Sequence, residues 1–71
     1  MVLPAASCGK SLRLLHIDAG QGVRSRLAAM GMVPGVEVKV LVNEGRGPLI
    51  VTLDGNRIML GRGMAEKIMV G

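Results

Sequence analysis

The sequence predicts a small, mainly β domain in which five short strands form a barrel, together with one short helix and one helical turn. Three observations predict this class. The chain has 71 residues, which is enough for a single hydrophobic core. Apolar and polar residues alternate over several short stretches, as they do in half-buried strands. Eleven glycines and three prolines occur in the chain, mostly between these stretches, and such residues are typical of tight turns.

The first strand is expected over residues 10–17, where the alternation leaves the identity of the buried face open. The two alternating sets are Leu12, Leu14 and His16 on one side, and Arg13, Leu15 and Ile17 on the other. Both sets contain apolar residues, so either set is compatible with the core. A loop over residues 18–22 then leads to the helix.

The helix is short and ends at a glycine. Val23, Leu27 and Met30 recur at the spacing of one helical face, and the pattern extends over about eight residues. Gly31 suits the left-handed residue that ends a helix, because it lacks a Cβ atom. Met32 is expected to pack back on the last helical turn, as the apolar residue after such an end commonly does.

The second strand follows a tight turn. Pro34 presets the φ angle of the first central position of a type II turn, and Gly35 supplies the positive φ angle of the second. After this turn, apolar and polar residues alternate clearly, which predicts a strand. The residues expected on its apolar face are Val36, Val38, Val40 and Val42.

Three more strands are predicted in the second half of the chain. A hairpin loop over 44–48, a tight turn over 54–56 and one helical turn over 64–67 precede them in order. The inward residues are Leu49, Val51 and Leu53 in the third strand, Ile58 and Leu60 in the fourth, and Ile68 and Val70 in the fifth. With one helix between the first and second strands, this order describes a small SH3-like barrel. Closure is expected, because it removes exposed strand edges.

Two parts of this pattern resemble the FeoA family. Residues 26–35, which carry the end of the helix and the turn, are similar to the helix-to-strand signature of that family, and Glu66-x-Ile68-x-Val70 resembles its last strand. The resemblance covers residues 9–70 of a single domain over 1–71, with 1–8 as an N-terminal segment. It implies a cytoplasmic accessory and regulatory module of bacterial ferrous iron transport. Such a module acts on a FeoB-type membrane GTPase permease and performs no chemistry of its own.

Charge and composition restrict the other partners. The formal net charge is +4, and the basic residues are scattered rather than clustered, which fits a solvated basic surface, an acidic protein partner or an anionic membrane surface. The chain has no Phe, Tyr or Trp, so it lacks the stacking platforms on which small barrels bind single-stranded nucleic acid. Binding to nucleic-acid phosphates alone stays an alternative function, as does a detached SH3-like sensor module of a metal-dependent repressor.

The chain offers little chemistry. Cys8, His16 and Asp18 are the residue types that bind transition metals, but their spacing matches no metal-ligand motif. We therefore expect no metal site within one chain and no cofactor, although a weak site shared between two copies stays open. The sequence shows no pattern that combines a nucleophile, a base and a third group that orients the base, so we expect no enzyme activity. No signal-peptide pattern or membrane-length apolar run is present, which predicts a cytoplasmic domain.

The candidate partner-binding residues surround the end of the helix. They are Arg24, Arg26, Leu27, Met30 and Met32. Arginine would attract an acidic partner, and methionine side chains adapt to apolar partners. Ordinary burial in the core is the alternative for Leu27 and Met30. A core built without aromatic residues also favours oligomerisation as a source of stability.

Overall fold

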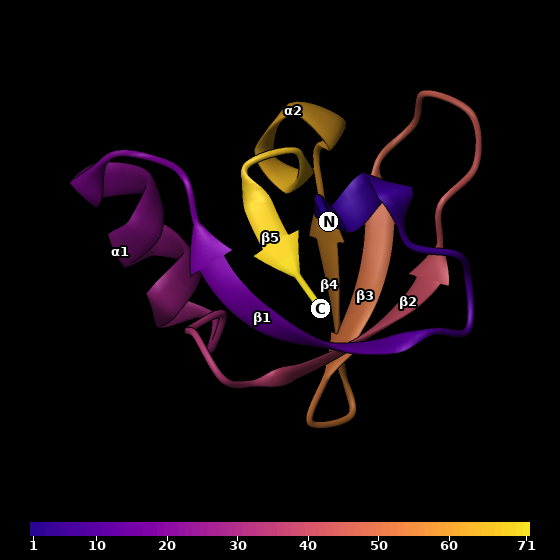
Figure 1. Cartoon of the computed structure of the whole chain (residues 1–71), viewed down its shortest axis with the longest axis horizontal. Helices are drawn as coiled ribbons and strands as arrows, with labels where there is room; N and C mark the ends of the chain where they lie inside the picture. The colour runs from indigo at the N-terminus through magenta and orange to yellow at the C-terminus, as the bar shows by residue number, and fades with distance from the viewer.

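A computed structural model describes residues 1–71 and contains five strands. In chain order the elements are the 3₁₀ turn η1 (Leu3–Ala5), β1 (Ser11–Ile17), α1 (Gln21–Ala29), β2 (Glu37–Val42), β3 (Leu49–Leu53), β4 (Asn56–Leu60), α2 (Arg62–Ala65) and β5 (Ile68–Val70) (Figure 1). The expected order of five strands, one helix between the first two and a helical turn before the last is confirmed. The helical turn α2 begins at Arg62 rather than at Met64, directly after β4.

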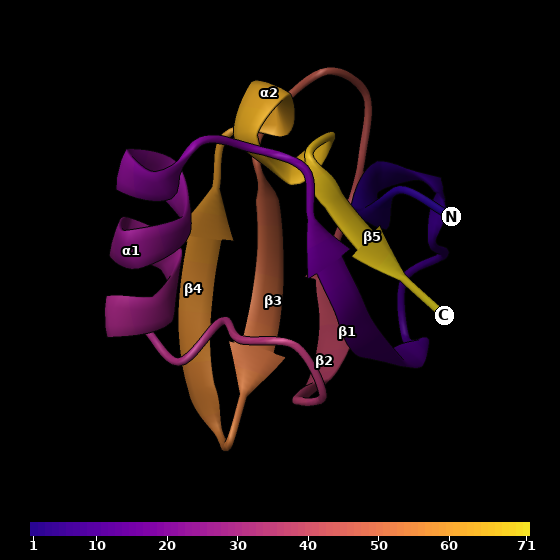
Figure 2. The ribbon, with the colours of Figure 1, turned by 60° about the vertical axis from the view of Figure 1, so that its left-hand side comes forward.

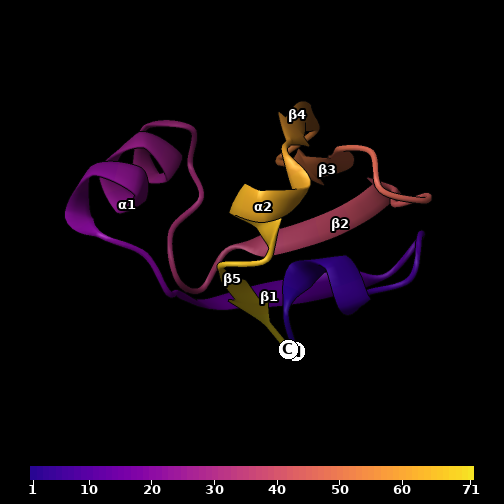
Figure 3. The same cartoon turned by 90° about the horizontal axis from the view of Figure 1, so that it is seen from above.

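The strands form one antiparallel sheet in the order β4-β3-β2-β1-β5 (Figure 2). Seen from above, the sheet curls, and α2 lies between β4 and β5 (Figure 3). No ladder joins these two outer strands. The barrel is therefore open between β4 and β5, whereas the sequence predicted complete closure. No helix is both long enough and apolar enough to cross a bilayer.

The core consists of aliphatic side chains from all five strands. Its 15 buried residues include Leu3, Leu14, Met32, Val38, Val40, Leu49, Val51, Ile68 and Val70. The inward residues predicted for β3 and β5 are buried, as are Val38, Val40 and Leu60, whereas Ile58 is half-buried. Each fully buried side chain of this kind contributes about 1.5–3 kcal/mol. The alternation in the sequence therefore identifies most of the core correctly.

Two irregularities in the sheet change which residues face the core. The register between β1 and β5 shifts between Leu14 and His16. As a result Leu14 and Ile17 are buried while Leu15 and His16 are exposed, so neither alternating set of β1 faces inward as a whole. An extra residue in one strand reverses the alternation beyond it.

The second irregularity lies near the end of β2. The register between β2 and β3 shifts between Val40 and Val42. Val42 is 38% exposed, so its predicted place on the apolar face is wrong. Val36, just before the strand, is half-buried. The inward positions of β2 are thus Val38 and Val40.

The N-terminal segment is part of the core, which no pattern in the sequence had indicated. Leu3 and Ala6 are buried, and Val2 forms an antiparallel bridge with Met69 on the outer edge of β5. The Val70 N–H donates to the Met1 carbonyl at 2.8 Å. Residues 1–6 therefore cover an edge of the sheet that would otherwise be free.

Candidate partner-binding surface

The helix α1 stands at one end of the molecule, to the side of the curled sheet (Figures 1 and 3). Of its nine residues only Leu27 is buried, and Val23 is half-buried. No side chain caps its N-terminus, and its first turn contains no acidic residue. Most of the helix surface is therefore available to a partner, and the helix is attached to the core through Val23 in its first turn and Leu27 near its end.

The C-terminal end of α1 is a Schellman motif. Gly31 has a φ angle of +90°, and its N–H donates to the Ala28 carbonyl at 2.9 Å. The Met32 N–H donates to the Leu27 carbonyl at 2.9 Å, and both side chains are buried. The predicted glycine end of the helix and the apolar residue that follows it are confirmed. Met30, expected on the buried face, is the C-cap residue and is 45% exposed.

The chain after the helix is fixed to β1 by a tight turn. Gly35 has a φ angle of +98°, and the Val36 N–H donates to the Val33 carbonyl at 3.3 Å, as the predicted type II turn requires. The Gly35 N–H donates to the Leu14 carbonyl at 2.7 Å, while the Arg13 guanidinium donates to the Gly35 carbonyl at 2.8 Å. These hydrogen bonds thus tie the turn that follows α1 to β1.

The structure divides the five candidate partner-binding residues into two groups. Leu27 and Met32 are 1% and 0% exposed and belong to the core, so they can support a binding surface but cannot form it. Arg24, Arg26 and Met30 are exposed. Val33, an exposed apolar residue between the helix end and the turn, adds to this region. The sequence signal for Val33 was its apolar character directly before Pro34.

The exposed arginines lie on different sides of α1. Side chains two residues apart are rotated by roughly 200° about the helix axis. Arg24 and Arg26 therefore leave the helix on opposite sides. Residues four apart are neighbours on the helix surface, which places Met30 beside Arg26. We call Arg26 and Met30 the α1 surface. It combines a cation in the last helical turn with an exposed thioether.

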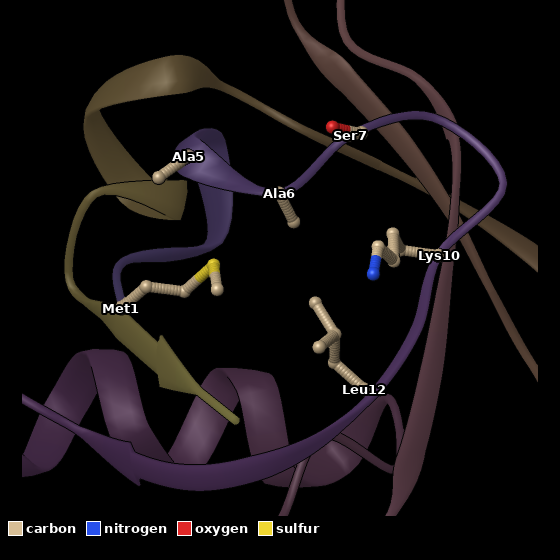
Figure 4. A pocket seen from close by; sticks show the side chains of 6 residues that line it. All are labelled: Met1, Ala5, Ala6, Ser7, Lys10 and Leu12. Atoms are coloured by element: carbon tan, nitrogen blue, oxygen red, sulfur yellow. The ribbon is translucent and has the colours of Figure 1, made fainter.

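The remaining candidates are the metal-ligating residue types Cys8, His16 and Asp18. The structure contains no group of three or more His, Cys, Asp or Glu side chains that could hold a metal ion. Cys8 and His16 are exposed. A cavity of about 100 Å³ lies between the N-terminal segment and the start of β1. It is lined by Met1, Ala5, Ala6, Ser7, Lys10 and Leu12 (Figure 4). Such a volume accommodates a few water molecules, and its lining offers no carboxylate, thiol or imidazole ligand.

These features define a small SH3-like β domain with an exposed helix. The FeoA domain model matches residues 1–71, and the chain belongs to the FeoA domain family. The match begins at residue 1, so it includes the N-terminal segment that the sequence resemblance left out.

Known proteins agree with this assignment. The chain is 43% identical over 68 residues to a protein of Methanocaldococcus jannaschii named as a candidate Fe(2+) transport protein A, covering 96% of this chain and 82% of that protein. A crystal structure of an iron uptake regulatory protein (FeoA) superposes with a TM-score of 0.92 at 31% identity, covering 99% of this chain and 93% of that one. A manganese-dependent transcriptional repressor matches with a TM-score of 0.85 at 24% identity, covering 96% of this chain and 39% of the repressor. This last likeness shows a shared fold alone.

Proposed function

We propose that this protein is a cytoplasmic accessory module of ferrous iron transport that acts by binding the cytoplasmic part of a FeoB-type membrane GTPase permease. Membership of the FeoA domain family and the name of the Methanocaldococcus jannaschii relative support a role in this transport system. The absence of a catalytic sequence pattern fits a protein that changes its partner by binding rather than by chemistry. The observation that carries the binding role is the exposed α1 surface.

The α1 surface would supply a charged contact and an apolar contact to the permease. Arg26 is exposed in the last turn of α1 and would attract an acidic patch. Met30 is 45% exposed beside it, and its flexible side chain can fill an irregular apolar pocket. Leu27 and Met32 beneath them hold the helix end in place. The permease surface that fits is therefore acidic around an apolar depression.

Binding would regulate transport only if the module prefers one state of the permease. A ligand protein shifts a conformational equilibrium by the difference between its affinities for the two states. The affinity should therefore differ between the permease domain loaded with a non-hydrolysable GTP analogue and the same domain loaded with GDP. Equal affinities would argue against regulation through this contact while leaving the contact itself in place.

The experiment compares two charge reversals on the same helix. Arg26→Glu should weaken binding to the purified permease domain about tenfold at low salt, because it removes an attraction and introduces a repulsion. Arg24→Glu makes the same charge change on the opposite side of α1 and serves as the matched control. Met30→Gln should weaken binding without changing its salt dependence. If Arg26→Glu folds normally and binds as well as the parent protein, the α1 surface is not the permease contact.

A further inference from the structure

The outer face of the sheet carries an apolar row that the proposed function does not use. Val42 pairs with Ile50, and Ile50 pairs with Met59, across β2, β3 and β4. Directly opposed residues lie on the same face of a sheet, and the neighbouring inward positions Val40 and Val51 are buried. We call Val42, Ile50 and Met59 the outer row. Met59 is 67% exposed, the highest value among the large apolar residues.

A cationic row runs beside the outer row. Lys39 pairs with Thr52, and Thr52 pairs with Arg57. Lys39 and Arg57 are exposed. The outward positions of β3 and β4 are Ile50, Thr52, Arg57 and Met59, none of which is acidic. This part of the face therefore combines apolar side chains with positive charge that no acidic residue on β3 or β4 offsets.

Arg57 and Met59, the two outward residues of β4, also direct backbone groups away from the sheet. β4 is the last strand of the sheet and pairs only with β3. The hairpin closes at the pair Leu53 and Asn56 through a two-residue turn, and Asp54 and Gly55 in that turn both have positive φ angles, as in a type I′ turn. Hydrogen-bonded and non-hydrogen-bonded pairs alternate from this closing pair. The N–H and C=O groups of Arg57 and Met59 therefore point to the free edge.

We propose that the free edge of β4 binds an extended, acidic segment of a partner protein as an additional antiparallel or parallel strand. The backbone groups of Arg57 and Met59 would pair with the added strand, as in other complexes formed by strand addition. An acidic side chain of that strand would lie beside Arg57, and an apolar side chain two positions away would lie beside Met59. This edge shares no residue with the α1 surface, and the proposal does not depend on the proposed permease contact.

The charge on this edge selects against the other obvious occupant, a second copy of the chain. A second β4 would present Arg57 and Met59 again, and each copy carries a formal net charge of +4. Cations on edge strands commonly prevent a protein from pairing with itself. An acidic strand converts the same cation from a repulsive group into an attractive one, so Arg57 favours an acidic partner over self-association.

The test uses a peptide with the required pattern. In Glu-Thr-Val-Thr-Glu-Thr-Val-Thr, one face alternates glutamate with valine and the other face is threonine. Titration of this peptide into the ¹⁵N-labelled protein at low salt should shift the amide signals of β4 most. Hydrogen exchange at the Arg57 and Met59 amides should slow, because these donors become paired. The same peptide with lysine in place of glutamate should not bind.

Two variants examine the side chain and the backbone separately. Arg57→Glu, at an exposed position, should weaken peptide binding about tenfold. Met59→Pro removes an N–H that β3 does not use, so the β3–β4 ladder should persist while peptide binding is lost. Arg26→Glu on α1 is the matched control and should bind the peptide like the parent protein.

Three results would overturn the proposal. Signal changes confined to α1 would move the acidic-segment site to that helix. Equal binding of the lysine peptide would remove the role of Arg57. Binding to phosphatidylglycerol vesicles without binding to the peptide would replace the protein partner by an anionic lipid surface.

Discussion

Arg62 in α2 donates a hydrogen bond of 3.0 Å from its Nη2 to the side-chain oxygen of Asn43, which directly follows β2. The Asn43 Nδ2 donates in turn to the carbonyls of Pro4 and Ala6, each at 2.8 Å. The Arg62 Nε donates to the Gly47 carbonyl at 3.1 Å. One side-chain amide therefore connects the N-terminal segment, the β2–β3 loop and α2, which adjoin one another where the barrel is open.

Replacing Asn43 should destabilise the protein. Asn43→Ala removes both donors from the Pro4 and Ala6 carbonyls, so the free energy of unfolding should fall by about 1–3 kcal/mol in urea titrations. Gln21→Ala removes an exposed hydrogen bond to Ser25 on α1 and should cost less than about 0.5 kcal/mol. Equal losses for the two variants would show that the Asn43 amide does not hold the N-terminal segment in place.

Any side chain at Gly31 should destabilise the protein, for two separable reasons. A Cβ atom there would lie 2.9 Å from Leu53 Cδ2, and the φ angle is +90°. Gly35 has a similar φ angle of +98° but open space around its Cα hydrogen. Gly35→Ala therefore measures the cost of the backbone conformation, about 1 kcal/mol. Gly31→Ala should lower the melting temperature further, and Gly31→Val further still. A Gly31→Ala protein as stable as Gly35→Ala would show that Leu53 moves aside freely.

The bulge near the end of β2 predicts that substitution by aspartate has a large effect at one valine of this strand and a small effect at another. Val38 is fully buried, so Val38→Asp places an unpaired charge in the core and should prevent folding at 25 °C, as judged by circular dichroism. Val42→Asp introduces the same group at a partly exposed position and should lower the free energy of unfolding by less than about 1.5 kcal/mol. Comparable loss of structure in both variants would mean that Val42 faces the core after all.

A single chain should bind Fe²⁺ or Zn²⁺ only weakly. The structure gathers no set of three metal-ligating side chains, and an isolated imidazole such as that of His16 is a poor site. Anaerobic calorimetry should therefore detect no submicromolar one-to-one binding. Such binding, if abolished by His16→Ala, would contradict this expectation. A stoichiometry of one metal per two chains, accompanied by dimerisation, would indicate a site shared between copies.

The sequence alone was sufficient to predict positions whose structure depends only on neighbouring residues in the chain. Gly31 and Gly35 require positive φ angles, and Leu49, Val51 and Leu53 alternate on a regular strand. Both kinds of position could be predicted without knowing the tertiary structure. The candidate site was predictable only in part, because the periodicity marked Leu27 and Met30 alike, although only Leu27 packs against the core.

The features that the sequence did not predict depend on distant partners. The register shifts at Leu14 and Val40 arise from pairing with other strands, so alternation within one strand could not reveal them. Leu3 is buried because residues 1–6 lie against β5 and α2, far away in the chain. The outer row joins residues from three strands through their registers and exists only in the folded sheet.

The pairing of the N-terminal segment with β5 also brings the first and last described residues together. The Met1 nitrogen donates to the Val70 carbonyl at 2.9 Å, and both ends lie on the same side of the molecule (Figure 2). A domain whose ends adjoin can be inserted into a surface loop of another protein without stretching its host, and it can be circularly permuted. The exposed β2–β3 loop, residues 44–48, is the natural place to open a permuted chain. In such a chain the original ends would be joined to each other, and the α1 surface and the β4 edge would stay intact.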